Sequence, residues 1–333
     1  MKKASALIIL IIMISGVLYA GVGTTAVDIL KIPTGIKSQG VGGAYIAISD
    51  GVEGIEINPG GLGLIEKQEI MLIHDMYIEG VMNESIFYGY TFEKAGTIGA
   101  GIKILTTGNI KQTLETDAGE YAGEGDDVSG FNYSAEIAYS TKLSNFIYSD
   151  FTKNLNLGIG LKISGENLED YSNFSISADV GGIYTFIIEE EDFLSNRGQF
   201  LWNKAGVGVV FRNLGTSFNA GVTPISMGLG LYTQFLNVGI AKNKVRISAD
   251  ADYNMDNGIN LRYGLEYEQN IEAFVFAIRA GGNFNPEERL AGGFTLGGGI
   301  GMKQGNVKYS LDYVYLPYNE LGSVHKMGLN VKF

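Results

Sequence analysis

The sequence after Lys67 is dominated by short segments in which apolar and polar side chains alternate. In residues 155–164, Leu157, Ile159 and Leu161 fall on one face, and glycine, lysine and serine fall on the other. A period of two places successive side chains on opposite faces of a β-strand. The pattern predicts an all-β chain of about 14 antiparallel strands. Because this number is even, the first strand begins and the last strand ends on the same side of the barrel. The expected strands are 68–78, 83–92, 96–106, 131–141, 155–164, 173–186, 205–212, 226–236, 243–253, 258–269, 272–284, 291–302, 306–316 and 323–333.

Two architectures share this alternation, a soluble β-sandwich and a membrane β-barrel. The apolar faces are aromatic near the strand ends, whereas the polar faces carry glycine and charge. The chain has 48 glycines, 19 tyrosines and 17 phenylalanines but only 5 prolines. Membrane barrels have aromatic girdles on the lipid side and small or charged residues inside. The composition therefore favours a membrane β-barrel.

The N-terminal residues 1–20 have the pattern of a cleavable signal peptide. Lys2 and Lys3 precede an apolar run at 7–17, and cleavage is expected after Ala20. The alternative is an uncleaved anchor, but the run is short for a span of about 20 residues. The final strand alternates up to a terminal aromatic residue, Phe333. We therefore predict export to a bacterial outer membrane, with contacts to membrane lipid and Phe333 as a C-terminal signal for the barrel assembly machinery.

Residues 21–66 are apolar and glycine-rich but keep neither a helical nor a strand period. We expect them to form a plug, or hatch, inside a barrel of residues 67–333. Two motifs stand out, a close-packing cluster and a turn: Gly42, Gly43, Ala44 and Tyr45, and then Asn58, Pro59 and Gly60. Five apolar residues of the plug are candidate contacts for a hydrophobic ligand: Leu30, Ile32, Ile36, Val41 and Ile46. The alternative is that they only pack against one another and against the barrel wall.

Charged residues of both signs occupy the face expected to point into the barrel. We predict that they pair across the lumen and hold the plug, and the alternative is that they are separate rim charges. The predicted network comprises Asp179, Arg246, Asp250, Arg262, Glu266, Arg279 and Asp312.

The sequence argues against several functional classes. There is no cysteine, and the net charge is −12 without a basic patch, which argues against nucleic acid as a partner. The only histidines are His74 and His325, and no Gly-x-Ser-x-Gly motif is present, so we predict neither an enzyme nor a cofactor. An acidic loop at 107–130, the longest connection, leaves calcium binding open against a merely hydrated loop.

Motifs at the two ends of the chain resemble the FadL-like outer-membrane proteins, and more closely their PorV/PorQ branch. The matching residues are Leu30 to Pro33, Gly42 to Ala47, Asn58 to Leu62, Asp312, Tyr313, Leu321, Gly322, and His325 to Phe333. Gly60 departs from the family, which usually has alanine after Asn-Pro. The resemblance implies a fourteen-stranded barrel with an N-terminal hatch in its lumen.

The same resemblance implies two alternative functions. The first is passive transport of hydrophobic, fatty-acid-like small molecules across the outer membrane. The second is that of a non-conducting PorV-type barrel, which works with a secretion or envelope-organisation protein as its partner.

Overall fold

The computed structural model describes residues 25–169, 171–187, 200–218, 221–237, 243–256, 258–284 and 293–333. The signal peptide predicted at 1–20 and residues 21–24 of the predicted plug lie outside these ranges.

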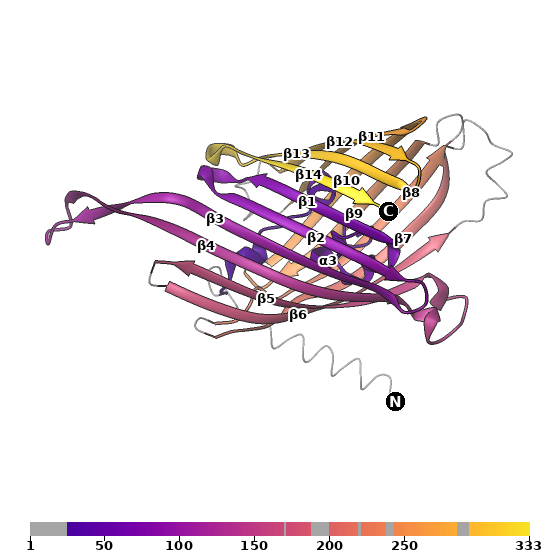
Figure 1. Ribbon diagram of the computed structural model, residues 1–333, viewed down its shortest axis with the longest axis horizontal. Helices are drawn as coiled ribbons and strands as arrows, with labels where there is room; N and C mark the ends of the chain where they lie inside the picture. Colours follow the sequence, from indigo (N-terminus) through magenta and orange to yellow (C-terminus); the bar gives the residue numbers. More distant parts are fainter. Residues whose placement is uncertain are drawn as a thin grey trace.

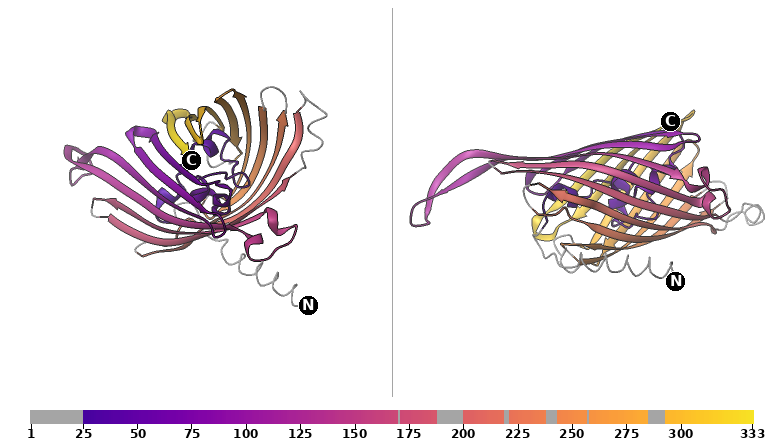
Figure 2. Two further views of the ribbon diagram at one scale, coloured as in Figure 1. Left: turned by 45° about the vertical axis from the view of Figure 1, so that its right-hand side comes forward. Right: turned by 90° about the horizontal axis from the view of Figure 1, so that it is seen from below.

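The strands form one closed barrel in which each strand pairs antiparallel with its sequence neighbours, and β1 pairs with β14 to close the ring (Figures 1 and 2). The fourteen strands predicted from the alternation are confirmed. They are β1 Gln68–Met76, β2 Met82–Phe92, β3 Gly96–Glu115, β4 Tyr121–Lys142, β5 Leu155–Leu168, β6 Tyr171–Ile187, β7 Phe200–Ser217, β8 Ser226–Asn237, β9 Asn243–Asn254, β10 Gly258–Ile271, β11 Phe274–Asn283, β12 Phe294–Gln304, β13 Val307–Pro317 and β14 Ser323–Lys332.

The barrel is apolar outside and polar inside. On β5, Leu161 is 52% exposed on the outer face, whereas its neighbour Lys162 is only 4% exposed. Exposed apolar surface in water costs about 25 cal/mol per Å² relative to burial, so a soluble protein would not repeat this arrangement on every strand. Aromatic side chains, among them Tyr88 and Tyr90 on β2, lie on the same outer face. The wall therefore has the surface of a membrane-spanning barrel, and the alternative of a soluble sandwich is wrong.

The prediction of a long loop at 107–130 is wrong. Strands β3 and β4 continue through it as a two-stranded ribbon that projects from the barrel (Figure 1, left), with pairs such as Ile110 opposite Val128. The turn takes up only residues 116–120 between the two strands. Because most of the ribbon's side chains are exposed on both faces, neither face needs apolar residues, and the alternation that marks a half-buried strand is absent.

Residues 25–67, hereafter the internal segment, run through the inside of the barrel (Figures 1 and 2). They contain the short helices η1 Asp28–Lys31, α2 Ile36–Gly40, α3 Gly54–Ile57 and η2 Pro59–Leu64. Ile36, Ile55 and Leu62 are buried in one apolar cluster with wall residues such as Phe87 and Val314. Among the described residues, no helix is long and apolar enough to cross a membrane. That the segment acts as a plug stays a prediction.

Candidate functional site

The turn at Asn58 seats the internal segment on a wall of glycines. Asn58 is fully buried; its Oδ1 accepts a 3.1 Å hydrogen bond from the Gly60 N–H, and its Nδ2 donates to the Ile46 carbonyl at 2.9 Å. A Cβ on Gly158 of β5 would lie only 2.2 Å from the carbonyl carbon of Pro59. A Cβ on Gly60 itself would lie 3.0 Å from the Cα of Gly182. Backbone therefore touches backbone here, and glycine at position 60 gives the turn room that alanine would take.

The cluster at Gly42 makes a second backbone contact with the opposite part of the wall. Gly42 and Gly43 have φ values of +67° and +80°, which glycine adopts without strain. A Cβ on Gly42 would lie 2.2 Å from the backbone nitrogen of Gly282 on β11. Ala44 and Tyr45 are buried, and the Tyr45 hydroxyl donates to Asp50 Oδ1 at 2.6 Å. The two predicted motifs thus hold the segment against separate sides of the barrel.

The five candidate ligand contacts do not share one environment. Leu30 lines a cavity, described below. Ile36 and Val41 are buried in two different apolar clusters, and Ile46 is buried against the wall at Gly228 and Gly230. Ile32 packs, half-buried, beside Val27 and Ile29. In this arrangement Leu30 can meet a ligand in the cavity, whereas the other four pack the segment into the barrel.

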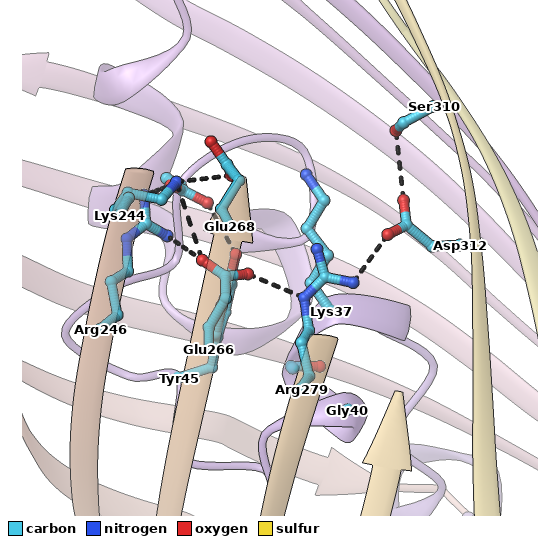
Figure 3. Close-up of polar contacts among 12 residues, drawn as sticks. Lys37, Gly40, Tyr45, Lys244, Arg246, Glu266, Glu268, Arg279, Ser310 and Asp312 are labelled. Atoms are coloured by element: carbon cyan, nitrogen blue, oxygen red, sulfur yellow. Dashed lines mark hydrogen bonds and ion pairs between the residues drawn. The ribbon is translucent and has the colours of Figure 1, made fainter. Parts of the chain in front are cut away.

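Four of the predicted lumen charges form a continuous chain of ion pairs across neighbouring strands (Figure 3). Arg246 on β9 lies 3.5 Å from Glu266 on β10, and Glu266 lies 2.7 Å from Arg279 on β11. Arg279 reaches over β12 to Asp312 on β13 at 2.7 Å. Gly299 on β12 permits this contact, because a Cβ there would lie 2.2 Å from the Asp312 carboxylate. The glycine run of β12 therefore makes room for an ion pair.

The other three predicted charges belong to separate groups. Arg262 pairs with Asp252 at 2.5 Å, and Asp179 pairs with Lys162 at 2.6 Å. Asp250 accepts a 2.8 Å hydrogen bond from the Ile46 N–H of the internal segment. All seven predicted charges point inward, but the structure divides them into three clusters of ion pairs and one contact with the segment's backbone.

Several charged residues of the lumen were not predicted. Glu136 on β4 lies 3.6 Å from Lys162, and Lys326 on β14 pairs with Asp75 on β1 at 2.6 Å. Lys103 on β3 and Lys162 on β5 occupy polar-face positions of predicted strands, so alternation alone marks them as inward-facing. The partners of Lys162 and Lys326 follow only from the strand register, which places opposite charges side by side on neighbouring strands. Lys103 instead pairs with Glu56 of the internal segment.

Among the described residues, three ion pairs join side chains of the internal segment to the barrel. Lys31 pairs with Asp256 just after β9, and in the other two pairs the segment supplies the carboxylate. Glu56 lies 2.7 Å from Lys103, and Asp50 lies 2.7 Å from Arg246.

Burial raises the pKa of Glu56, but the Lys103 ammonium, with Lys162 and the Thr34 N–H, lowers it more, so the pKa of Glu56 lies below its ordinary value. Burial likewise raises the pKa of Asp50, but the Arg246 guanidinium together with nearby lysines, Lys37 foremost, leaves that pKa lowered. Both carboxylates are therefore ionised at neutral pH.

The internal segment lies between two cavities that share no lining residue. We call the barrel end at the start of β1 and the end of β14 the terminal end, and the opposite end, where the ribbon projects, the hairpin end. The hairpin-side cavity has a volume of about 470 Å³, and Leu30, Glu56 and Lys103 are among its lining residues. The terminal-side cavity has a volume of about 400 Å³, and Asp50, Arg246 and Phe333 are among its lining residues. Each cavity is thus bordered by one of the two ion pairs in which the segment supplies the carboxylate, and Lys31 and Asp256 also line the hairpin-side cavity.

Phe333 lies just past the last pairing of the closing strands. Its N–H donates to the Gln68 carbonyl at 3.0 Å, and its side chain is 46% exposed. This contact ties the chain's last residue to the first residue of β1.

The two histidines face outward, away from both cavities. His74 Nδ1 lies 2.6 Å from Glu84, and His325 Nδ1 lies 2.6 Å from the Tyr313 hydroxyl. Within the described ranges, no group of three or more potential metal-ligating side chains converges, and these ranges include the acidic residues of the ribbon. The arrangement of the described residues therefore gives no support to calcium binding by this hairpin.

Comparison with known proteins finds similarity only at the level of structure. No family model and no curated protein matches the chain. The toluene transporter TodX of Pseudomonas putida matches with a TM-score of 0.50 and 10% identity, over 94% of this chain and 98% of that one. A Pseudomonas aeruginosa FadL homologue matches with a TM-score of 0.52 and 8% identity, over 91% of this chain and 98% of that one. The fold is that of the FadL-like barrels. The narrower resemblance of this FadL-like barrel to the PorV/PorQ branch stays a prediction.

Proposed function

We propose that this FadL-like barrel is an outer-membrane channel that passively conducts hydrophobic small molecules past the internal segment. The fold it shares with a toluene transporter and a FadL homologue supports a substrate of the aromatic-hydrocarbon or fatty-acid type. The apolar outer face supports a place in a membrane. Export through a signal peptide at 1–20 and assembly guided by Phe333 belong to the same proposal.

The observation that carries this proposal is the pair of cavities on either side of the internal segment. Apolar side chains line part of the hairpin-side cavity, among them Leu30, Ile57 and Phe87. Ligand sites combine such apolar walls with a few polar groups, and their volumes are usually about 300–1,000 Å³. A molecule in this cavity is separated from the second one by the packed segment, so passage requires the segment to move.

The residues assigned to the channel have roles in binding and movement, without a covalent step. The glycine motifs at Gly42 and Gly60 seat the hatch, and the lumen charges fix its position. Transport is then a change in the position of the segment that a bound molecule favours.

The uptake of a labelled molecule by bacterial cells tests the proposal. Cells that carry the protein in their outer membrane are expected to take up at least one of two labelled molecules, decanoate or toluene, several-fold faster than cells without it. Uptake of a sugar of similar mass should not change, because the lumen is closed to free diffusion. Equal uptake of the hydrophobic molecules by both kinds of cell would contradict transport and favour the non-conducting PorV-type barrel with a secretion or envelope partner.

A further inference from the structure

The two carboxylates that tie the internal segment to the wall are placed where an anion from either cavity can replace them. Glu56 and Lys103 both line the hairpin-side cavity, and Asp50 and Arg246 both line the terminal-side cavity. The Lys103 and Glu56 side chains are 7% and 16% exposed, so the pair is shielded but open to the cavity. Each pair thus presents a cation that is held by a carboxylate of the segment.

The pair on the hairpin side holds more than one part of the segment. The Lys103 ammonium donates to Glu56 and also to the Ile32 carbonyl at 2.9 Å. Glu56 in turn accepts a 3.1 Å hydrogen bond from the Thr34 N–H. Loss of the Glu56–Lys103 contact therefore loosens residues 32–34, which lead directly into helix α2 with its fully buried Ile36.

The terminal-side cavity has an excess of cationic side chains, five against the three carboxylate side chains of Asp50, Glu66 and Glu69. Lys67, Lys204 and Lys308 line it, and none of them has an ion-pair partner among the described residues. Arg246 and Lys332 line it too, but they are paired with Asp50 and Glu69. A site of this kind favours an anionic group over a neutral one.

We propose that the transported molecule is an amphipathic anion, and that its charged group releases the internal segment by taking the place of Glu56 on Lys103 and then of Asp50 on Arg246. This rests on the proposed channel function and specifies its substrate class. In this exchange the buried cation keeps a partner throughout, and the displaced carboxylate becomes hydrated in the cavity as the segment moves, so neither charge is left buried and unpaired. A neutral molecule with the same tail leaves the cation unpaired and does not open the ion pair.

The test measures release of the internal segment from the wall and does not depend on transport. In a protein with Ile36→Cys, the only thiol of the chain is fully buried, so its reaction with N-ethylmaleimide reports displacement of the segment. Decanesulfonate is expected to raise the reaction rate about tenfold in lipid bilayers, whereas 1-decanol, with the same tail, leaves it unchanged. Adding Glu56→Gln should raise the reaction rate about tenfold without any ligand, because the broken ion pair no longer holds the segment. Decanesulfonate should then raise the rate little further.

A matched control removes a carboxylate from an ion pair elsewhere. Asp127 pairs with Lys111 at 2.6 Å in the projecting ribbon, so Asp127→Asn should keep the low rate and the response to decanesulfonate. If Glu56→Gln prevents assembly, the double variant Glu56→Gln with Lys103→Met leaves no unpaired cation and should show the same raised rate.

Two results would overturn the inference: equal acceleration by decanesulfonate and decanol, or an unchanged rate in both Glu56 variants. Failure of the channel function is a different outcome, namely no uptake in cells although the thiol responds to decanesulfonate. Conversely, uptake of neutral and anionic molecules alike, with no anion effect on the thiol, leaves the channel intact and removes the substrate class.

Discussion

Joining Ile36 to Gly328 through a disulfide is expected to abolish uptake of labelled decanoate. A Cβ placed on Gly328 of β14 lies 3.6 Å from the Cβ of Ile36 in helix α2, within the range of about 3.5–4.5 Å that disulfides require. The chain has no native cysteine, so Ile36→Cys with Gly328→Cys gives one defined bond between the segment and the wall. The oxidised protein holds the segment in place, and reduction should restore uptake to the rate of the unlocked variant.

A second disulfide of equal Cβ separation controls for oxidation itself. A Cβ on Gly301 of β12 lies 3.6 Å from the Cβ of Ser310 on β13, and both residues belong to the wall. Oxidised Gly301→Cys with Ser310→Cys should conduct as well as its reduced form. Equal uptake by the oxidised and reduced Ile36–Gly328 protein would show that the segment need not move at this point.

Replacing Gly158 with alanine is expected to open the lumen to ions. The added Cβ would lie 2.2 Å from the Pro59 carbonyl carbon, and backbone atoms cannot move aside as a flexible side chain can. Overpacking of this kind costs roughly 1–3 kcal/mol, and the outer face of β5 is untouched. The cost therefore falls on docking of the segment. In planar bilayers the open state of single channels should be populated about 5- to 140-fold more often, since about 1.4 kcal/mol shifts an equilibrium tenfold.

Gly160 provides the matched control for Gly158. It faces the lumen from the same strand, two residues further along, but a Cβ there would lie 3.6 Å from its nearest neighbour, in ordinary contact. Gly160→Ala should keep the conductance of the unmodified protein. If Gly158→Ala stays equally closed, the turn at Asn58 does not hold the segment in the way described.

The alternation of apolar and polar side chains predicts this fold well where one face of a strand meets lipid and the other faces the polar lumen. Leu157, Ile159 and Leu161 lie on the outer face of β5 as their spacing indicates. The same reasoning misses the outer parts of β3 and β4, since water lies on both faces of the ribbon and neither face is selected to be apolar. Boundaries of the strands are uncertain for a related reason: β7 extends to Ser217, beyond the alternating residues 205–212.

The inward direction of the charges could be predicted, but their partners could not. Glu266 and Arg279 are paired because β10 and β11 place them directly opposite each other. The alternation of side chains does not reveal this register. Glu56 and Asp50 lie in an irregular segment without a period, so no pattern assigns them a direction. Their contacts with Lys103 and Arg246 follow only from the folded barrel.

A membrane barrel requires that the outer face of its wall meets lipid. Leu161 lies in the middle of β5 on the outer face. In the double variant Leu161→Trp with Trp202→Phe, the single tryptophan reports whether this position meets lipid or water. In bilayers we expect its fluorescence to be quenched strongly by lipids brominated in mid-chain and not by iodide in the aqueous phase. Quenching by iodide without any effect of the brominated lipids would place Leu161 in water and contradict the membrane barrel.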